Sequence, residues 1–396
     1  PSRRRCRRRK GRSCGPVCLG RPHTGRVPSP PTRIAGVDVA RGVALLGMGA
    51  VHVLPLEDAG GDPTWVEHVA SGRSAALFAV LAGVGLALAY GPRPSLPRAG
   101  AAVVVRAALI GGVGLLLGLL DSGLAVILAY YALFFVLVLP WLRAGPRALA
   151  ASALAVAVVV PFISRAVRDD LPDRDTASPD PGDLLEPVQL LSELLLTGYY
   201  PAAVWAAYLL AGLAVGRLAL GSRRTALGLV VVGAALAAGA MAASALLLGP
   251  LGGLDRLRDV ARVPEGETLE EVVQASRFGN VPTDSAWWLA TDAAHSSTPL
   301  DMLATTGSSL MVLGLALLVS TRLVAPLAAA GSMPLTLYTA HVLVVATTDT
   351  DDPTRYYLTQ VVVALVAATL WRRYLGRGPL EAAVAAAVRP LRRTRT

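Results

Sequence analysis

Three side chains on one apolar segment near the start of the chain are of types that could do chemistry. Within residues 33–56, which read RIAGVDVARGVALLGMGAVHVLPL, Asp38 and Arg41 are three residues apart and His52 follows eleven residues later. A run of about 20 mostly apolar residues can cross a membrane as a helix. Asp38 and Arg41 would then touch, and His52 would share a face with Arg41 about three turns away. We therefore expect a charged pair at one membrane surface and an imidazole toward the other, where ionisable groups usually mark function.

The elements that must position these side chains are transmembrane helices. The 396 residues are 54% hydrophobic and 16% charged, against roughly 25% charged in soluble domains, and the mean hydropathy is +0.53. This composition predicts an all-α, polytopic integral membrane helix bundle of about ten transmembrane helices. The apolar runs lie at 37–56, 74–90, 100–120, 123–142, 147–164, 199–216, 225–248, 302–320, 326–347 and 356–372.

The distribution of arginine predicts the orientation of these helices. Short loops that carry arginine alternate with acid-leaning loops such as LDSG and TDTDDPT. Because Lys and Arg are retained on the cytoplasmic side, we expect both termini to be cytoplasmic. The net charge of +10 is then explained by cytoplasmic anchors and by tails that lie on anionic lipid, and we expect no nucleic acid partner. The anchors are Arg93, Arg98, Arg143, Arg147, Arg217, Arg223, Arg224 and Arg322.

The chain divides into four predicted regions. Residues 1–32 are a basic, disordered tail, residues 33–220 a first transmembrane half, residues 221–376 a second half with a long outward loop at 249–300, and residues 377–396 an amphipathic basic tail. One hypothesis is that the first 26 or so residues are not translated in the cell, with translation starting at Val27. No function is assigned to the cysteines, which all lie in the first region: Cys6, Cys14 and Cys18.

Four segments in a fixed order carry a family resemblance. They are RIAGVDVARGVALLGM with a VH after it, WVEHVASGRSAALFAVLAGV, LLLTGYYPAAVWAAYLLAGLAVGRL, and STPLDMLATTGSSLMVLGLALL followed by PLAAAGSMPLTLYTAHVL. Over residues 33 to 380 the chain resembles the heparan-alpha-glucosaminide N-acetyltransferase-like superfamily of membrane acyltransferases, above all its bacterial branch with a C-terminal domain of unknown function. The resemblance implies that residues 33–220 are an acetyltransferase-like half. It also implies acetyl-CoA as the acyl donor, taken on the cytoplasmic side, and an acceptor on the far side.

The resemblance also implies roles for two histidines. In the family an asparagine closes the first span, and a histidine just before the second span serves catalysis. By motif, His52 stands at the asparagine position and His68 is the nearest match to the catalytic histidine. The family's lysine and tryptophan around that histidine are absent here. Glu67 precedes His68, and Ser71, Gly72 and Arg73 follow it.

Acyl transfer makes the same demands on the residues independently of the resemblance. A base must take the proton of the accepting hydroxyl or amine, which suits histidine near neutral pH, and donors must stabilise the developing oxyanion. The phosphates of coenzyme A need cations on the inner side. The predicted catalytic residues are His68, His52, Arg73 and His341, and the predicted donor-binding residues are Asp38, Arg41 and Arg106. No metal site is predicted, because no metal-ligand spacing occurs.

Each candidate also has a structural interpretation. His52 could be a hydrogen-bonded residue at a helix end, His68 an exposed loop residue, and His341 a partner in an interhelical hydrogen bond. Asp38 and Arg41 could be a structural ion pair. For Arg73 the alternatives are a carboxylate partner or an oxyanion role. His295, in DAAHSSTP, is interpreted mainly as part of a helix cap.

The predicted function is transfer of an acetyl or other acyl group from cytoplasmic acyl-CoA to an outward-facing cell-envelope sugar or glycolipid, by a multi-pass protein of the cell membrane. The expected partners are the lipid bilayer and a small-molecule or glycolipid acceptor, with a homo-oligomer left open. The alternatives are a transporter or exporter of a small metabolite, for which paired broken helices and midplane charges would be the signature, and a catalytically silent membrane scaffold.

Overall fold

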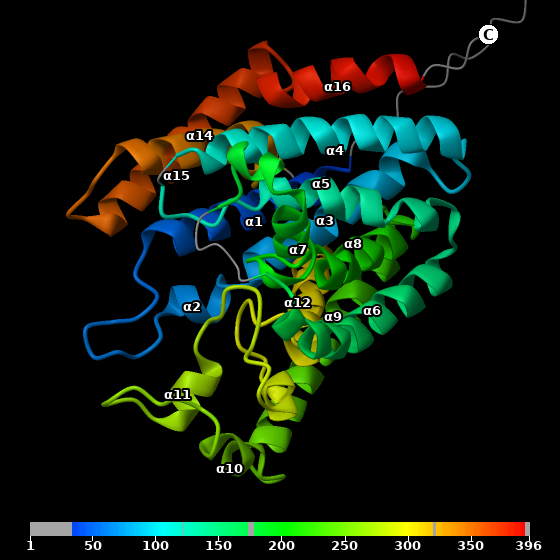
Figure 1. The fold of residues 1–396 in the computed structure, drawn as a ribbon. Coiled ribbons are helices and arrows are strands. Elements are labelled where there is room, and N and C mark those ends of the chain that lie inside the picture. The colour runs from blue at the N-terminus through cyan, green and yellow to red at the C-terminus, as the bar shows by residue number, and fades with distance from the viewer. Residues whose placement is uncertain (1–33, 121, 173–177, 320–321, 393–396) are drawn as a thin grey trace, which may run out of the picture. The chain divides into compact units, whose positions relative to one another are not determined.

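A computed structural model describes residues 34–120, 122–172, 178–319 and 322–392 (Figure 1). The predicted basic tail, its three cysteines and the proposed start at Val27 lie outside the described residues. Ile34–Thr396 form one compact unit. The described residues form helices and no β-strand, apart from one isolated bridge between Glu57 and Pro63. The all-α prediction is confirmed.

The helices differ widely in length. Those of ten residues or more are α1 (Ala35–Val53), α3 (Arg73–Tyr90), α4 (Leu96–Gly118), α5 (Leu128–Leu137), α6 (Pro146–Val167), α8 (Ala202–Gly216), α9 (Arg223–Leu248), α12 (Pro299–Leu318), α14 (Pro334–Thr347), α15 (Pro353–Tyr374) and α16 (Pro379–Arg392). The short ones are α2 (Trp65–Val69), α7 (Pro187–Ser192), α10 (Gly253–Arg258), α11 (Leu269–Gln274) and α13 (Ala325–Ala330). The 3-10 turns are η1 (Leu139–Arg143), η2 (Arg168–Asp170), η3 (Gly182–Leu185) and η5 (Ala286–Ala290), and η4 (Glu193–Thr197) is a π-helical turn.

Each of the ten predicted apolar runs contains a helix, but these helices are not equally able to cross a membrane. Among the described residues, six are long and apolar enough: Ala35–Val53, Trp65–Tyr90, Leu96–Gly118, Pro146–Asp170, Arg223–Leu248 and Pro299–Leu318. A seventh candidate is broken, because Pro187–Thr197 and Ala202–Gly216 meet at an angle of 54°. Helices α5 and α14 are apolar but shorter. The count of about ten spans and the cytoplasmic termini stay predictions.

The candidate spans fall into an interior set and a peripheral set. In α1, α3 and α12 more than half of the apolar window is buried, at 61%, 67% and 56%. In α4, α6 and α9 the buried share is 33%, 22% and 22%. The peripheral helices instead expose aliphatic side chains such as Leu116 and Val231, as expected of helix faces in contact with hydrocarbon. The chemistry-bearing side chains of α1 are therefore held in the interior.

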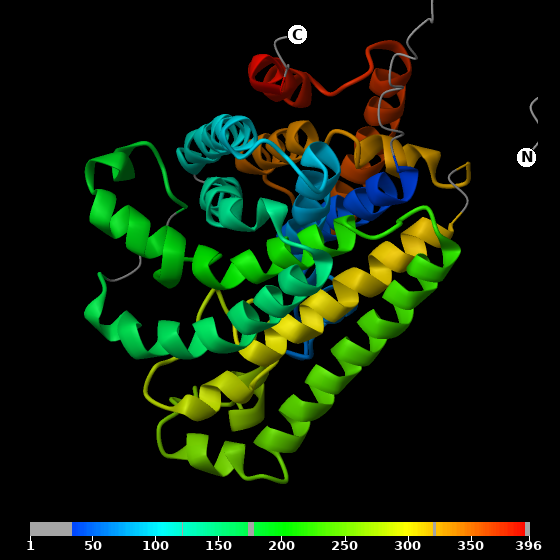
Figure 2. The same ribbon diagram turned by 90° about the vertical axis from the view of Figure 1, so that its right-hand side faces the viewer.

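Two helix crossings depend on glycine. Gly83 of α3 faces Gly212 of α8, and Gly233 of α9 faces Gly307 of α12, where a Cβ atom would collide with the backbone of the opposite helix. Figure 2 shows α9 and α12 lying side by side along their length. Small residues let membrane helices approach closely and gain packing contacts. These crossings hold α3 against α8, and α12 against the peripheral helix α9.

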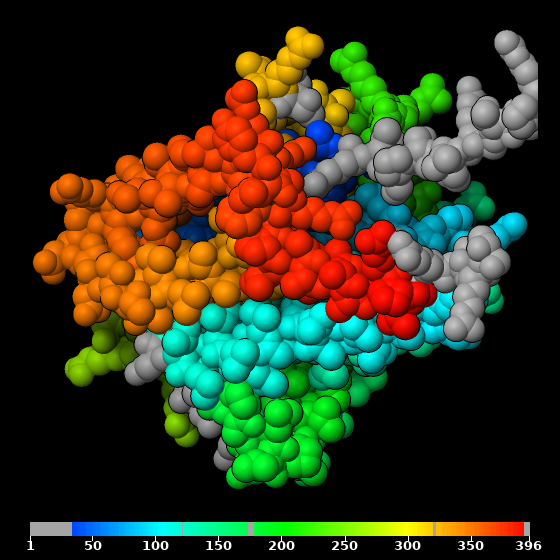
Figure 3. Space-filling view, turned by 90° about the horizontal axis from the view of Figure 1, so that it is seen from above, coloured from blue at the N-terminus to red at the C-terminus, as the bar shows by residue number. Residues whose placement is uncertain are grey.

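The last helix, α16, lies along α4 at one edge of the bundle (Figure 3). Its Glu381 carboxylate accepts hydrogen bonds from the backbone N–H groups of Leu335 (2.8 Å) and Thr336 (3.2 Å), and from the Thr336 hydroxyl (2.6 Å). Leu335 and Thr336 are in the first turn of α14, where free N–H groups favour a negative charge. Glu381 therefore ties α16 to the start of α14.

Candidate active site

Helix α1 positions a charged pair near its start. Asp38 is buried, and its Oδ1 atom lies 3.2 Å from Nη1 of Arg41. Nη2 of Arg41 also donates to the carbonyl oxygen of Leu81 on α3 at 3.4 Å. The predicted contact between Asp38 and Arg41 is thus present, and it orients the Arg41 guanidinium toward α3. Asp38 itself lines neither of the two cavities described below.

The first cavity, here called the arginine cavity, has a volume of about 220 Å³. Two arginines line it, Arg41 from α1 and Arg106 from α4. Glu381 of α16 also lines it, through the carboxylate that ties α16 to α14. The remaining polar lining comes from Ser332 and the tyrosine rings Tyr131 and Tyr338. The structure thus brings the two predicted donor-binding arginines to one hollow.

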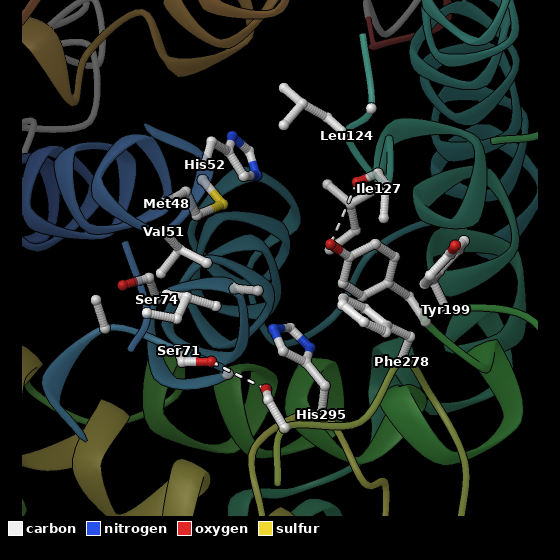
Figure 4. Close-up of a pocket in the computed structure, with 18 of the residues that line it drawn as sticks. Met48, Val51, His52, Ser71, Ser74, Leu124, Ile127, Tyr199, Phe278 and His295 are labelled. Atoms are coloured by element: carbon white, nitrogen blue, oxygen red, sulfur yellow. Dashed lines mark hydrogen bonds between the residues drawn. The ribbon is translucent and has the colours of Figure 1, made fainter. Parts of the chain in front are cut away.

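The second cavity, here called the histidine cavity, has a volume of about 230 Å³. His52 enters it from the last turn of α1, and His295 enters it from the loop before α12 (Figure 4). Ser71 and Ser276 also line it, and their hydroxyl oxygens are 3.2 Å apart. Aromatic rings complete the lining: Tyr199, Tyr200, Phe278 and Tyr338. This cavity therefore combines two imidazoles with serine and tyrosine hydroxyls within a largely apolar wall.

Tyr338 of α14 belongs to the linings of both cavities. Its ring lies edge-on to His52, with the two ring centroids 6.4 Å apart. Arg41 and His52, at opposite ends of the same helix, open into the two different cavities. Eleven residues of α-helix rise by about 16 Å. The two hollows are therefore neighbours along α1, separated in part by one tyrosine ring.

His295 is held by aromatic rings. Its imidazole is nearly parallel to the indole of Trp205, at 10° with centroids 6.2 Å apart, and lies edge-on to Tyr200 at 5.7 Å. Burial among these rings lowers the pKa of His295 to about 4, because a low-dielectric environment disfavours the charged form. His295 is therefore neutral near pH 7 and has a lone pair for accepting a proton.

The backbone around His295 is strained. His295 and Ser297 have positive φ values of 57° and 54°, which non-glycine residues rarely adopt and which cost of order 1–3 kcal/mol each. Hydrogen bonds hold this conformation: Ser297 N–H donates to Oδ2 of Asp301 (3.0 Å) and the Thr298 hydroxyl donates to the carbonyl of Thr291 (2.6 Å). Such strain clusters at functional sites, so the loop favours a role for His295 beyond helix capping.

His52 is the end of a chain of hydrogen bonds that crosses three helices. Its Nδ1 atom lies 3.0 Å from Nε2 of His341 on α14. Nδ1 of His341 lies 2.7 Å from Oε1 of Gln360 on α15. His341 lines neither cavity. The structure therefore places His341 behind His52, joined to it directly, although 289 residues separate them in sequence.

Two other predicted residues lie outside the cavities. His68 is on the short helix α2, where its side chain is exposed, and it lines neither cavity. Arg73 begins α3 between two cavity residues, Gly72 and Ser74, but is not itself part of the lining. The Arg73 charge acts on the buried carboxyl of Asp301, which favours the carboxylate-partner interpretation of this arginine. The roles predicted for His68 and Arg73 stay predictions.

Sequence reasoning gave His295 mainly a capping role and missed Tyr338 and Gln360, which the structure also brings to the site. Thr298 does cap α12, accepting from Asp301 N–H at 3.2 Å, but the cap interpretation of this loop hid the place of His295 in the cavity. Tyr338 and Gln360 lie in apolar runs and belong to no local motif. Only their contacts with residues far away in the sequence identify them. Within the described part of the chain, no cluster of His, Cys, Asp and Glu could hold a metal ion.

Comparison with known proteins gives the family. Residues 33–244 match the model of the family described as heparan-alpha-glucosaminide N-acetyltransferase, catalytic. No curated protein matches the chain. The matched region contains Arg41, His52 and Arg106, while His295, His341 and Gln360 lie beyond it. A membrane setting agrees with the apolar helices of the described residues. By more than half of its length, this chain belongs to the heparan-alpha-glucosaminide N-acetyltransferase catalytic family.

Proposed function

We propose that the protein is a multi-pass acyltransferase of the cell membrane. It takes an acetyl or related acyl group from acyl-CoA on the cytoplasmic side. It passes the group to a hydroxyl or amine of a cell-envelope sugar or glycolipid on the outer side. Membership of a membrane acyltransferase family supports this reaction class, and the arrangement of the two cavities supports the division into a donor side and an acceptor side.

The arginine cavity is the proposed donor site. Its volume of about 220 Å³ is below the range of roughly 300–1,000 Å³ that encloses whole drug-sized ligands. The cavity therefore suits one portion of an acyl-CoA rather than the whole molecule. Arg41 and Arg106 supply positive charge there for phosphate oxygens or for the thioester carbonyl. Asp38 acts by orienting Arg41.

The histidine cavity is the proposed acceptor site. The acceptor's nitrogen or oxygen attacks the thioester carbonyl carbon, and the new bond to carbon forms while Nε2 of His52 takes the acceptor's proton. The carbon–sulfur bond then breaks, and the departing coenzyme A thiolate takes that proton from His52. A base of this kind typically contributes 10²–10⁴-fold in rate. The Ser71 and Ser276 hydroxyls, which line the same cavity, are the proposed donors to the developing oxyanion.

One observation carries this proposal. A cavity lined by two arginines and a cavity lined by two histidines share the ring of Tyr338. A reaction between a phosphate-bearing donor on one side and a neutral acceptor on the other needs such a pair of sites. A movement of the Tyr338 ring would bring thioester and acceptor together.

The test uses membranes that contain the full-length protein and acetyl-CoA labelled with ¹⁴C in the acetyl group. We expect label to appear in the glycolipid or glycan fraction with the wild type and to be absent with His52→Gln. Thr359→Val, on the exposed face of α15, is the control for a mutation that leaves both cavities intact. Treatment with hydroxylamine releases an ester but not an amide, and so identifies the acceptor atom. Wild-type membranes that transfer no label from coenzyme A would overturn the proposal.

A transporter is the second candidate, because one candidate span of the described residues is broken. The 54° bend between Pro187–Thr197 and Ala202–Gly216 resembles the discontinuous helices of transporters, which occur in related pairs. The first segment ends in the π-helical turn Glu193–Thr197. Proteoliposomes loaded with acetyl-CoA and sugar separate the two functions: transport moves an unchanged solute, whereas acyl transfer yields free coenzyme A thiol.

A further inference from the structure

Gln360 is a polar side chain in an otherwise apolar part of α15. The surrounding residues read LTQVVVALVAATL, and neighbours such as Leu358 and Val362 are exposed on the outside of the bundle. Gln360 is only partly exposed, and its Oε1 atom accepts from Nδ1 of His341 at 2.7 Å. A polar side chain among apolar ones usually has a specific partner. His341 is that partner.

The contact between the two histidines has the geometry of an in-line hydrogen bond. The rings of His52 and His341 are 18° from parallel with centroids 5.2 Å apart, and the two facing nitrogens are 3.0 Å apart. The closest approach is therefore between ring edges, at Nδ1 of His52 and Nε2 of His341. An edge contact of nearly coplanar rings aligns an N–H bond of one ring with the lone pair of the other.

The amide of Gln360 then determines where each proton lies. A carbonyl oxygen only accepts, so Nδ1 of His341 carries hydrogen. A neutral imidazole has one donor and one acceptor nitrogen, so Nε2 of His341 is the acceptor. Nδ1 of His52 must therefore carry hydrogen, and Nε2 of His52 keeps its lone pair. His52 lines the histidine cavity, where that lone pair is the proton acceptor.

We propose that Gln360 is a positioning residue which, through His341, fixes His52 in the tautomer whose Nε2 atom is the catalytic base. This inference rests on the proposed function for the role of His52 as a base. The logic is that of a base oriented by a third group, with a neutral amide in place of a carboxylate. No described carboxylate is hydrogen-bonded to either ring, so the amide sets the tautomer without adding charge.

The test that does not depend on activity is nitrogen NMR of the full-length protein with ¹⁵N-labelled histidine in lipid bilayers. The chemical shift of a ring nitrogen distinguishes a protonated from a bare atom, and His52→Gln assigns the His52 signals among the five histidines. We expect Nδ1 of His52 to be protonated and Nε2 bare in the wild type. A wild-type spectrum with hydrogen on Nε2 of His52 overturns the inference, whatever the variants do.

The variants separate the acceptor role from packing. Gln360→Met keeps the length of the side chain but removes the acceptor, and we expect both His52 tautomers in its spectrum. Gln360→Glu restores an acceptor and should restore the wild-type tautomer. Thr359→Val, one residue away on the exposed face of α15, should leave the spectrum unchanged. Identical His52 signals in Gln360→Met and wild type overturn the inference.

Kinetics supply the second readout. We expect Gln360→Met to lower kcat by about tenfold or more, because a base held in the wrong tautomer loses much of its effect, while the KM for acetyl-CoA stays the same. Gln360→Glu should recover most of the kcat. If the wild type is active and Gln360→Met has the same kcat, the positioning role of Gln360 is wrong but the proposed function is not. A wild type without any transfer defeats the proposed function, and the NMR spectrum still decides the tautomer.

Discussion

The arginine cavity and the histidine cavity are nearly equal in volume, at about 220 and 230 Å³, but opposite in chemistry. The first presents cations, which recognise negative charge through long and flexible side chains. The second presents imidazole rings and hydroxyls, groups of the kind that transfer protons. Keeping the cations away from the imidazoles is useful, because a nearby positive charge would weaken a base. In the proposed function, donor recognition and proton transfer therefore take place at different ends of α1.

The walls of the two cavities differ as well. The arginine cavity is lined mainly by helices, with residues from α1, α3, α4, α5, α14 and α16. The histidine cavity draws much of its lining from loops, at residues 123–125, 199–200 and 276–278. Loops tolerate change in sequence and shape better than packed helices do. We therefore expect the proposed donor cavity to have rigid walls, and the walls of the proposed acceptor cavity to vary more in sequence and shape.

The largest expected effect comes from the histidine cavity. We expect His52→Gln to lower kcat by about 10²–10⁴-fold, because the proposed base is lost, with little change in the KM for acetyl-CoA. Initial rates of thiol release over a range of acetyl-CoA concentrations measure both constants. A rise in KM with an unchanged kcat would place the donor, rather than the acceptor, beside His52 and would contradict the proposed roles of the two cavities.

The arginine cavity should show the opposite pattern. We expect Arg41→Gln and Arg106→Gln each to raise the KM for acetyl-CoA about tenfold or more, because a hydrogen bond to a charged group contributes roughly 1.5–3 kcal/mol. The kcat should change much less. Arg223→Gln is the control, since Arg223 is an exposed arginine at the start of α9 that lines neither cavity. Equal effects in all three variants would point to membrane electrostatics instead.

His295 should make stability depend on pH. Burial lowers its pKa from 6.5 to about 4, so between these values the folded protein binds fewer protons than the unfolded chain. This contribution to the free energy of unfolding is complete above pH 6.5 and is lost as the pH falls toward 4, with a loss of about 2 kcal/mol by pH 5. Thermal unfolding in detergent at pH 7 and pH 5 should show a smaller pH-induced loss in His295→Gln than in the wild type.

The smallest effect is expected at His68. Because its side chain is exposed on α2 and lines neither cavity, His68→Ala should lower kcat by far less than His52→Gln does. The same rate assay decides between them. If His68→Ala were the more damaging change, the reaction would take place at the surface near α2, and the histidine cavity would lose its proposed role.

The fold was predictable from the sequence to the level of its helices but not of their roles. Every apolar run contains a helix, yet composition says little about where a helix breaks. Pro140 lies just after α5 in the 3-10 turn η1, Pro201 precedes α8, and Pro334 begins α14. These prolines shorten helices that hydropathy alone draws as full spans, because proline cannot donate to the helix ladder.

The candidate site was predictable where its residues share an element. Asp38, Arg41 and His52 lie on one helix, so their spacing alone places the charged pair and the imidazole at opposite ends. The approach of His341 to His52 joins residues 289 positions apart, which no periodicity can indicate. Gln360 is still less visible, since a single amide in an apolar run acquires meaning only when its partner is known.

The left-handed backbone at His295 and Ser297 limits which residue can serve at position 297. Glycine would adopt the φ of 54° at position 297 without strain, so Ser297→Gly would relax the loop. It would also remove the hydroxyl that accepts from the Trp205 indole at 3.3 Å, and Trp205 is the ring that lies parallel to His295. Relief of backbone strain and alignment of the imidazole thus place opposite demands on position 297, and serine meets the second of them.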